Sequence, residues 1–264
     1  MSKSISCLQI TDFHLFEDPK KTLLGTNTDD SLSRVLAHVK AKGHEPDFIA
    51  ITGDISQDFS VRAYERMLEL FQDFTCPIYS IPGNHDSIPN MMKILAPSYI
   101  QHERYIDLPN WVIIFLNTHV PGKVYGHLDD TELLFLTSHL KEAKNKNVLI
   151  FLHHHCVDIG EGWLNPLGVQ NAEKFHAIIH GLKNIKAVVC GHIHQEFHVQ
   201  KDGVWFLGTP STCIQFKPKM KRFTLDERNP GYREFTLLED GQILTTVHRI
   251  ENYTHTYDPN AAGY

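Results

Sequence analysis

Gly83, Asn84, His85 and Asp86 form the stretch of this sequence with the most obvious capacity for chemistry. They follow a short apolar run, residues 77–81, that is predicted to be a buried strand. Gly83 lets the backbone turn sharply and approach a ligand closely, because it has no Cβ. Asn84 offers a neutral carbonyl oxygen, and His85 offers a titratable ring. An ordinary polar turn is the alternative, so the interpretation depends on what the rest of the chain places beside it.

Four other predicted strands also end in side chains that can bind a metal or transfer a proton. In chain order these are Asp12 with His14, Asp54, His153, and His192 with His194. The spacing of the D-x-H and H-x-H pairs suits one site, because residues two apart in an extended segment point to the same side. Each cluster alone could instead be a polar strand end or a turn.

His153, His154 and His155 are consecutive and follow the apolar strand predicted at residues 147–152. Solvated surface explains such a run poorly, so we expect a metal or catalytic role for at least one of the three. His153 and His154 are expected to point in different directions, because successive side chains alternate along an extended segment.

Alternating strands and helices would position these motifs. The apolar pattern predicts strands at 4–11, 47–52, 77–81, 111–117, 147–152 and 185–190, and helices at about 28–39, 61–74, 130–140 and 171–182. Thr28 or Asp29 can cap the first helix. Right-handed crossovers make the first three strands parallel, so that their loops emerge at one edge of the sheet, where α/β sheets bind ligands.

The remaining chain is expected to complete the same α/β unit. Three prolines break any long element in residues 88–110, and hairpins are predicted near residues 196–207 and 233–249. No repeat, low-complexity tract or linker divides the chain. We therefore expect residues 1–264 to be a single domain, with hairpins and strands of residues 191–264 completing a second sheet.

Composition narrows the class of protein. The chain has 264 residues, 42% hydrophobic and 21% charged, as in soluble globular proteins, and its net charge of −6 argues against a general nucleic-acid binder. Its five cysteines contain no CxxC pair, so neither a disulfide framework nor a thiolate zinc site is indicated. No apolar run is long enough to span a bilayer, and no signal-peptide core is visible. A reduced cytoplasmic setting and a small-molecule substrate are expected, with no nucleic-acid or membrane partner; the oligomeric state stays open.

The five strand ends together predict a binuclear metal centre. Carboxylate, imidazole and amide groups suit borderline divalent metals such as Zn, Mn and Fe. Seven candidate ligands are too many for one ion that must also hold a substrate, but they fit two ions that share one carboxylate. Two such ions lie about 3.5–4 Å apart and can clamp a phosphoryl group during in-line displacement.

The ordered motifs D-x-H, G-D, G-N-H-D, the strand-end histidine and G-H-x-H resemble the calcineurin-like metallophosphoesterase superfamily. They extend from Asp12 to His194. A closer resemblance is to the bacterial 3′,5′-cyclic-AMP phosphodiesterases, the class III cyclic-nucleotide phosphodiesterases. It rests on residues 9–12 with 14–16, on residues 190–196, on residues 209–213 with 215–218, and on the terminal pair Gly263-Tyr264.

The resemblance implies a four-layer α/β sandwich, with two mixed sheets flanked by helices and a di-metal site at the carboxyl ends of the strands. It implies one metal, typically iron, held by Asp12, His14 and His194, and a second, Mn, Zn or Fe, held by Asn84, His153 and His192, with Asp54 bridging the two. Cys156 is a departure, because relatives often have proline after the histidines.

The implied activity is hydrolysis of 3′,5′-cyclic AMP to 5′-AMP by in-line attack of a metal-bridging hydroxide. His85, oriented by Asp86, would stabilise the phosphoryl group or protonate the leaving oxygen. The substrate phosphate would meet His14, Asp54, Asn84, His85, His153 and His194. Two alternatives are another small diester, such as a glycerophosphodiester, and a non-catalytic scaffold on the same fold.

Overall fold

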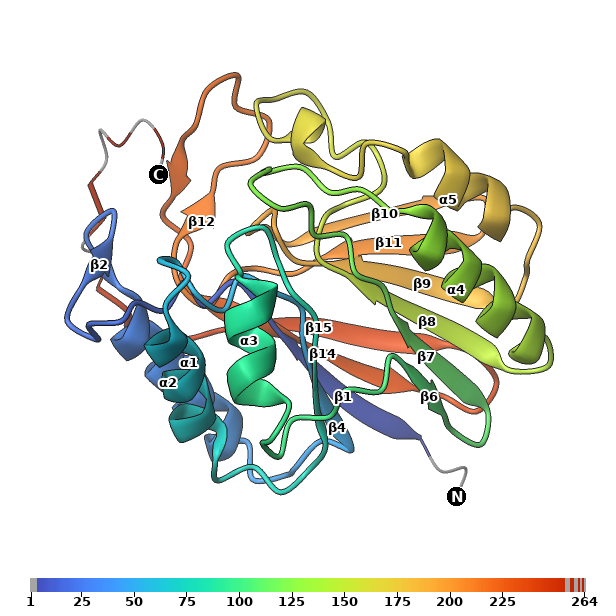
Figure 1. The fold of residues 1–264 in the computed structure, drawn as a ribbon, viewed down its shortest axis with the longest axis horizontal. Coiled ribbons are helices and arrows are strands. Elements are labelled where there is room, and N and C mark those ends of the chain that lie inside the picture. The colour runs from blue at the N-terminus through green and yellow to red at the C-terminus, as the bar shows by residue number, and fades with distance from the viewer. Residues whose placement is uncertain (1–3, 255–256, 259–260, 262, 264) are drawn as a thin grey trace.

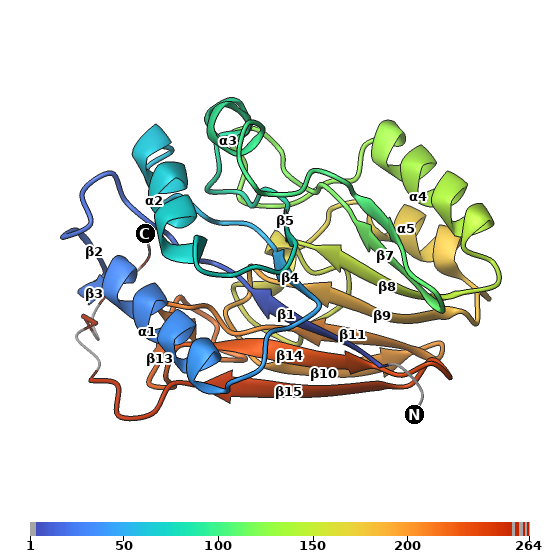
Figure 2. The same cartoon turned by 90° about the horizontal axis from the view of Figure 1, so that it is seen from below.

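Two β-sheets pack face to face and carry helices on their outer faces in the computed structural model of the chain (Figure 1). The structure describes residues 4–254, 257–258, 261 and 263. Tyr264, the last residue of the Gly263-Tyr264 motif, lies outside them. Helices α1, α2 and α3 cover one sheet and α4 and α5 cover the other, which gives the predicted four layers (Figures 1 and 2).

The first sheet has five strands in the order β15-β14-β1-β4-β5. Its central strands are parallel, as predicted, and are connected through α1 and α2. The bounds of these elements are β1 (Ile5–Ile10), α1 (Thr28–Ala41), β4 (Phe48–Ile51), α2 (Val61–Phe71) and β5 (Ile78–Ser80), followed by α3 (Ile88–Leu95). The loops after β1, β4 and β5 therefore meet at one edge of this sheet.

The second sheet has six strands in the order β10-β11-β9-β8-β7-β6. Strands β7, β8, β9 and β11 are parallel, and the outer strands β6 and β10 are antiparallel to their neighbours. The bounds are β6 (Tyr105–Asp107), β7 (Trp111–Phe115), α4 (Asp130–Glu142), β8 (Asn147–Leu152), α5 (Ala172–Ile179), β9 (Ile185–Cys190), β10 (Phe197–Lys201) and β11 (Val204–Gly208).

The last hairpin differs from the prediction that residues 191–264 complete the second sheet. Strands β14 (Gly231–Leu237) and β15 (Ile243–Arg249) extend the first sheet instead, because β14 pairs antiparallel with β1 along the register Ile5 to Leu237. Without this partner, the backbone groups along one side of the buried strand β1 would lack hydrogen bonds. Within the described part of residues 191–264, the β10–β11 hairpin alone joins the second sheet.

Short polar side chains begin the main helices. Asn27 accepts a hydrogen bond from the Asp30 N–H at the start of α1, so Asn27 is the cap, not Thr28 or Asp29 as predicted. Ser60 caps α2 and Asp129 caps α4 in the same way. Residues 88–110, expected to lack a long element, contain the eight-residue helix α3.

Minor elements complete the described chain. They are β2 (Thr22–Leu23), β3 (Thr26–Asn27), the 3₁₀ turn Asn165–Leu167, β12 (Gln215–Phe216) and β13 (Leu225–Asp226). Among the helices of the described residues, none combines the length and apolar character needed to cross a lipid bilayer.

An aromatic stack fills the space between the two sheets. The ring centroids of Tyr79 and Phe115 lie 5.6 Å apart, and those of Phe115 and Phe151 lie 5.3 Å apart. Phe235 of β14 meets Phe151 edge-on at 6.0 Å. Because these rings come from both sheets, their packing holds the sheets at the distance that the loops of the site require.

Phe235→Ala should lower the free energy of unfolding by about 3–5 kcal/mol, because it removes a fully buried ring and leaves a cavity between the sheets. Leu134→Ala is the control, since Leu134 is 66% exposed on α4 and its loss should change the same quantity by no more than about 0.5 kcal/mol. Chemical denaturation of both variants measures the difference. Equal effects would mean that the inter-sheet rings contribute little.

Candidate metal centre

Asp12, His14 and His194 form one cluster of buried side chains where the two sheets meet. Their potential ligand atoms lie within 4.8 Å of one another. The Nε2 atoms of His14 and His194 are 3.2 Å apart, and Nε2 of His194 is 3.4 Å from Asp12 Oδ1. The structure thus brings together residues that are 180 positions apart in the chain.

Hydrogen bonds fix how the two histidines of this cluster point. Nδ1 of His14 donates to the Gln57 side-chain oxygen at 2.6 Å, and Nδ1 of His194 donates to the Ile214 carbonyl at 2.8 Å. Burial lowers the pKa of His14 to about 3, so this ring is neutral. With the protons on Nδ1, the Nε2 lone pairs face each other, an arrangement that a bound cation would stabilise.

A second cluster contains Asn84, His153 and His192. Nδ1 of His153 donates to the Thr52 carbonyl at 2.7 Å, which turns Nε2 toward Asn84 Oδ1 at 3.1 Å. Nε2 of His192 is buried and has no hydrogen-bond partner in the described part of the chain. Burial lowers the pKa of His192 well below its usual value. A neutral, buried and unpaired imidazole nitrogen is a suitable metal ligand.

Asp54 lies between the two clusters. Its Oδ2 atom is 3.7 Å from Nε2 of His14 and 3.4 Å from Nε2 of His153. Burial alone would raise the pKa of Asp54, but the charge of the neighbouring His153 holds it well below its usual value. One ionised carboxylate therefore faces histidines of both clusters, which is the position that a bridging ligand needs.

The loops that carry these residues are joined by backbone hydrogen bonds. The N–H of Asp12 donates to the Gly53 carbonyl at 3.0 Å, and the N–H of His14 donates to the Asp54 carbonyl at 2.9 Å. The N–H of His192 donates to Asp12 Oδ1 at 3.1 Å, which ties the second sheet to the first. The loops after β1, β4 and β9 thus form one connected framework.

Five of the candidate ligands have left-handed backbone conformations. They are Asp12 (φ 58°), His14 (φ 51°), Asp54 (φ 52°), His192 (φ 62°) and His194 (φ 49°). These conformations correct the extended geometry that we assumed for the D-x-H and H-x-H pairs. Non-glycine residues adopt this region at an energetic cost, and such strain concentrates at functional sites.

The loop of residues 83–87 is held by Asp86. Its carboxylate accepts hydrogen bonds from the N–H groups of Ile55, Ser56 and Gly83 and from the Tyr64 hydroxyl. Burial raises the pKa of Asp86 to about 6. These bonds make Asp86 an anchor between this loop and the loop after β4. Its role in orienting the His85 ring stays a prediction.

His85 lies at the border of the first cluster. Its N–H donates to Asp54 Oδ1 at 2.8 Å, and its ring meets the His14 ring edge-on with centroids 5.1 Å apart. Burial lowers the pKa of His85, so the ring is neutral near pH 7. The partly exposed side chain is thus held beside the candidate ligands.

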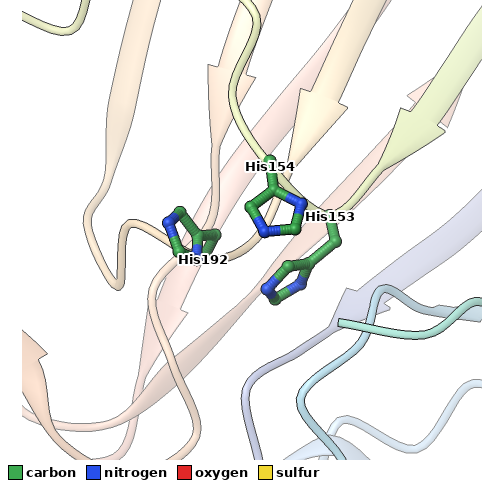
Figure 3. A group of neighbouring side chains, drawn as sticks. All are labelled: His153, His154 and His192. Atoms are coloured by element: carbon green, nitrogen blue, oxygen red, sulfur yellow. The ribbon is translucent and has the colours of Figure 1, made fainter. Parts of the chain in front are cut away.

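His153, His154 and His192 gather their rings in one group, contrary to our expectation that His153 and His154 point apart (Figure 3). The strand ends at Leu152 and the chain bends over the next residues, so side-chain alternation no longer applies. Even so, the nitrogens of His154 are occupied, with Nδ1 2.7 Å from Thr118 Oγ1 and Nε2 3.1 Å from the Val124 carbonyl.

His154 and His155 therefore pack beside the candidate ligands and help to hold them in place. The His154 ring lies 4.6 Å from the His192 ring, and Nε2 of His155 donates to the Asn165 carbonyl at 3.0 Å. Of the three consecutive histidines, only His153 is placed against Asp54 by the contacts above. Cys156, the departure from the expected proline, is buried beneath this loop.

Several residues that shape the site were missed from the sequence. Gln57 and the carbonyls of Thr52 and Ile214 hold the histidine rings, and Phe216 stacks on His194 with centroids 4.1 Å apart and planes 9° apart. Phe216 lies in the 215–218 segment of the resemblance, but nothing in its residue type indicated this contact. Backbone carbonyl acceptors leave no signal in a sequence.

Comparison with known proteins identifies the family. Residues 5–196 match the family described as calcineurin-like phosphoesterase. The chain belongs to that family. A 3′,5′-cyclic adenosine monophosphate phosphodiesterase of Vibrio vulnificus is 40% identical over 99% of this chain and 96% of its own length. The corresponding Escherichia coli K12 protein is 37% identical over 98% and 95%.

Solved structures agree on the fold of this phosphoesterase. A dimetal phosphatase from Danio rerio matches with a TM-score of 0.63 and 15% identity, covering 91% of this chain and 98% of the other. A Plasmodium protein, GAP50, matches with a TM-score of 0.67 and 12% identity, covering 98% and 90%. Family membership and the two histidine and aspartate clusters together support a di-metal site.

Gly83→Ala should reduce metal content strongly although Gly83 is no ligand. An added Cβ would overlap the Asp54 backbone and carboxylate and would lie 2.7 Å from Cε1 of His153, so those side chains would be displaced. Elemental analysis of purified protein measures the metal bound per chain.

Gly122→Ala is the control for this substitution. It introduces strain at a positive φ of 68°, but its Cβ would point into open space. We expect it to retain its metals despite a modest loss of stability. If Gly83→Ala bound as much metal as the unaltered protein, that result would contradict the close packing described here.

Proposed function

We propose that this phosphoesterase hydrolyses 3′,5′-cyclic AMP to 5′-AMP and so lowers cellular cyclic AMP. The observation that carries the proposal is the convergence of Asp12, His14, Asp54, His153 and His194 in a chain 40% identical over nearly its full length to a relative with that named activity. The cyclic nucleotide is the proposed small-molecule partner. A reduced cytoplasmic setting and a single domain remain predictions.

We propose two metal sites that share Asp54. The first would use Asp12, His14, Asp54 and His194, and the second would use Asp54, Asn84, His153 and His192. The first has two carboxylates and so favours the more highly charged ion, which we propose to be iron. The second has one carboxylate, one amide oxygen and two imidazoles, a set that suits Mn, Zn or Fe in the divalent state.

Bound at these sites, the two cations would neutralise phosphate charge and lower the pKa of water toward neutrality. The chain itself would orient the reaction. The Nδ1 hydrogen bonds of His14, His153 and His194 hold the imidazoles with Nε2 toward the site, and Asn84 directs its carbonyl oxygen there. This preorganisation means that little rearrangement is needed when the phosphodiester binds.

His85 is the proposed catalytic residue. Its neutral ring lies beside His14 and the Asp54 carboxylate, at the edge of the cluster. A neutral imidazole donates a hydrogen bond to phosphate readily, and this role fits the lowered pKa better than transfer of a full proton to the ribose 3′-oxygen. The remaining side chains proposed to meet the phosphate are those named above: His14, Asp54, Asn84, His153 and His194.

His85→Ala should lower kcat for cyclic AMP by about 10²–10⁴-fold, because a positioned hydrogen-bond donor or acid is lost at the reacting group. Both metals should remain bound, since His85 is not a proposed ligand. His180→Ala, an exposed histidine at the end of α5, is the matched control and should leave kcat unchanged. Loss of metal in His85→Ala would refute the role assigned here.

The substrate is tested by assaying metal-loaded protein in parallel on cyclic AMP, cyclic GMP, a glycerophosphodiester and bis-p-nitrophenyl phosphate. We expect cyclic AMP to give the highest kcat/KM of the natural diesters, and a chelator to abolish all activity until metal is restored. Preference for the glycerophosphodiester would support the alternative substrate. Absence of turnover on every substrate would support a non-catalytic scaffold.

A further inference from the structure

A cavity of ≈ 640 Å³ lies between the two sheets, at the side where β10 and β11 face β14 and β15. The four strands run along the same side of the molecule in Figure 2. The lining residues used below are Glu196, Trp205, Leu207, Arg233 and Ile243. This volume falls in the range of about 300–1,000 Å³ that is typical of small-molecule sites.

The cavity exists because the apolar side chains that fill the space between the sheets stop before the strands themselves end. Leu207 still packs in that core, but Trp205, two residues earlier on β11, is 41% exposed. Its partner on β9 is the small Ala187, which fills little space. On the facing strand β15, the partly buried Ile243 lies opposite Leu237, on the face of the sheet that points toward the second sheet. Apolar side chains therefore line a hollow that they do not fill.

Arg233 supplies a buried positive charge at this cavity. Its side chain is 4% exposed, and its Nη2 atom donates to the Gly208 carbonyl at 2.8 Å while Nη1 lies 3.3 Å from Thr245 Oγ1. Its Nε atom has no hydrogen-bond partner among the residues the structure describes. Burial lowers the pKa of Arg233 to about 10, so the guanidinium is still charged at pH 7.

No carboxylate neutralises this charge directly. Within residues 4–254, 257–258, 261 and 263, no carboxylate oxygen lies within 4.0 Å of the Arg233 guanidinium. Buried arginines are ordinarily paired, because an isolated charge in a medium of low dielectric constant is costly. An anion bound in the cavity would therefore find both a positive charge and apolar walls.

We propose that this cavity is a second binding site, separate from the metal centre, for a small organic anion with an apolar body. The anionic group, a carboxylate, sulfonate or phosphate, would bind near Arg233. The apolar body would contact Trp205, Leu207 and Ile243. The proposal does not depend on the function assigned to the metal centre.

Glu196 sets the affinity of this site. It is exposed and also lines the cavity, and its negative charge acts on Arg233 from a distance. The same charge would repel a bound anion. Glu196→Gln should therefore strengthen binding of an anion, a gain that a damaged fold would not produce.

The probe is 1-anilinonaphthalene-8-sulfonate, an aromatic anion whose fluorescence rises on binding, and its neutral analogue is N-phenyl-1-naphthylamine. We expect one saturable site for the anion per chain. Arg233→Gln should lower the affinity for the anion by about tenfold and the affinity for the neutral analogue by less than about twofold. Glu196→Gln should raise the affinity for the anion by roughly two- to threefold.

Two aliphatic variants form the matched control. Ile243→Ala, which removes apolar surface from the cavity wall, should lower the affinity for both probes by about threefold, whereas Leu134→Ala, on α4 outside the cavity, should change neither affinity. Asp54→Ala, which alters the metal centre, should leave binding of both probes unchanged. The proposal is overturned if Glu196→Gln fails to raise the affinity for the anion, if Arg233→Gln lowers the affinity for both probes equally, or if Ile243→Ala and Leu134→Ala behave alike.

Discussion

The approach of histidines from both sheets to the single carboxylate of Asp54 is the interaction on which the site depends. His14 reaches it from the loop after β1, and His153 reaches it from the end of β8. Buried, ionised Asp54 would be costly without positive charge nearby. The two sheets must therefore pack closely enough for their strand ends to meet. The aromatic stack between the sheets provides that separation over the length of the strands.

Backbone geometry then determines which atoms face inward. The left-handed conformations of Asp12, His14 and Asp54 turn the chain sharply, and backbone hydrogen bonds between the loops after β1 and β4 stabilise the turns. These strained backbone conformations lie within the loops themselves. The hydrogen bonds that stabilise the loops include those from backbone N–H groups to the Asp86 carboxylate. A site held by these hydrogen bonds has its side chains oriented before any ligand binds, which favours catalysis by preorganised charge.

Much of the fold was predictable because the parallel strands are continuous apolar runs ended by polar motifs. The strand Asn147–Leu152 was predicted at the bounds the structure shows, and the crossovers β1-α1-β4-α2-β5 followed from alternation. The sheet joined by β14 was not predictable, because its apolar pattern fits the edge of either sheet. Only the unpaired side of β1, a tertiary feature, decides that choice.

The site was predictable in its residues but not in its geometry. Residue types and order indicated the ligands, whereas the acceptors on Thr52 and Ile214 are backbone atoms that every residue has. The grouping of His154 with His153 was predicted wrongly, because the rule of alternation ends where the strand ends. Sequence patterns describe regular elements well, and active sites lie where regular elements stop.

The distribution of charge between the sheets follows the same principle. The middle of the sandwich contains a cluster of apolar and aromatic side chains, whereas the carboxylates and imidazoles of the candidate metal centre follow the strand ends and Arg233 lies beside the cavity. The metal centre is one such place and the Arg233 cavity is another. At the first, carboxylates and imidazoles compensate one another within the protein. At the second, the guanidinium has carbonyl and hydroxyl partners but, among the residues that the structure describes, no adjacent carboxylate. Because a buried charge is costly unless it is compensated, each of these two places needs a counter-charge, either from the protein or from a bound ligand.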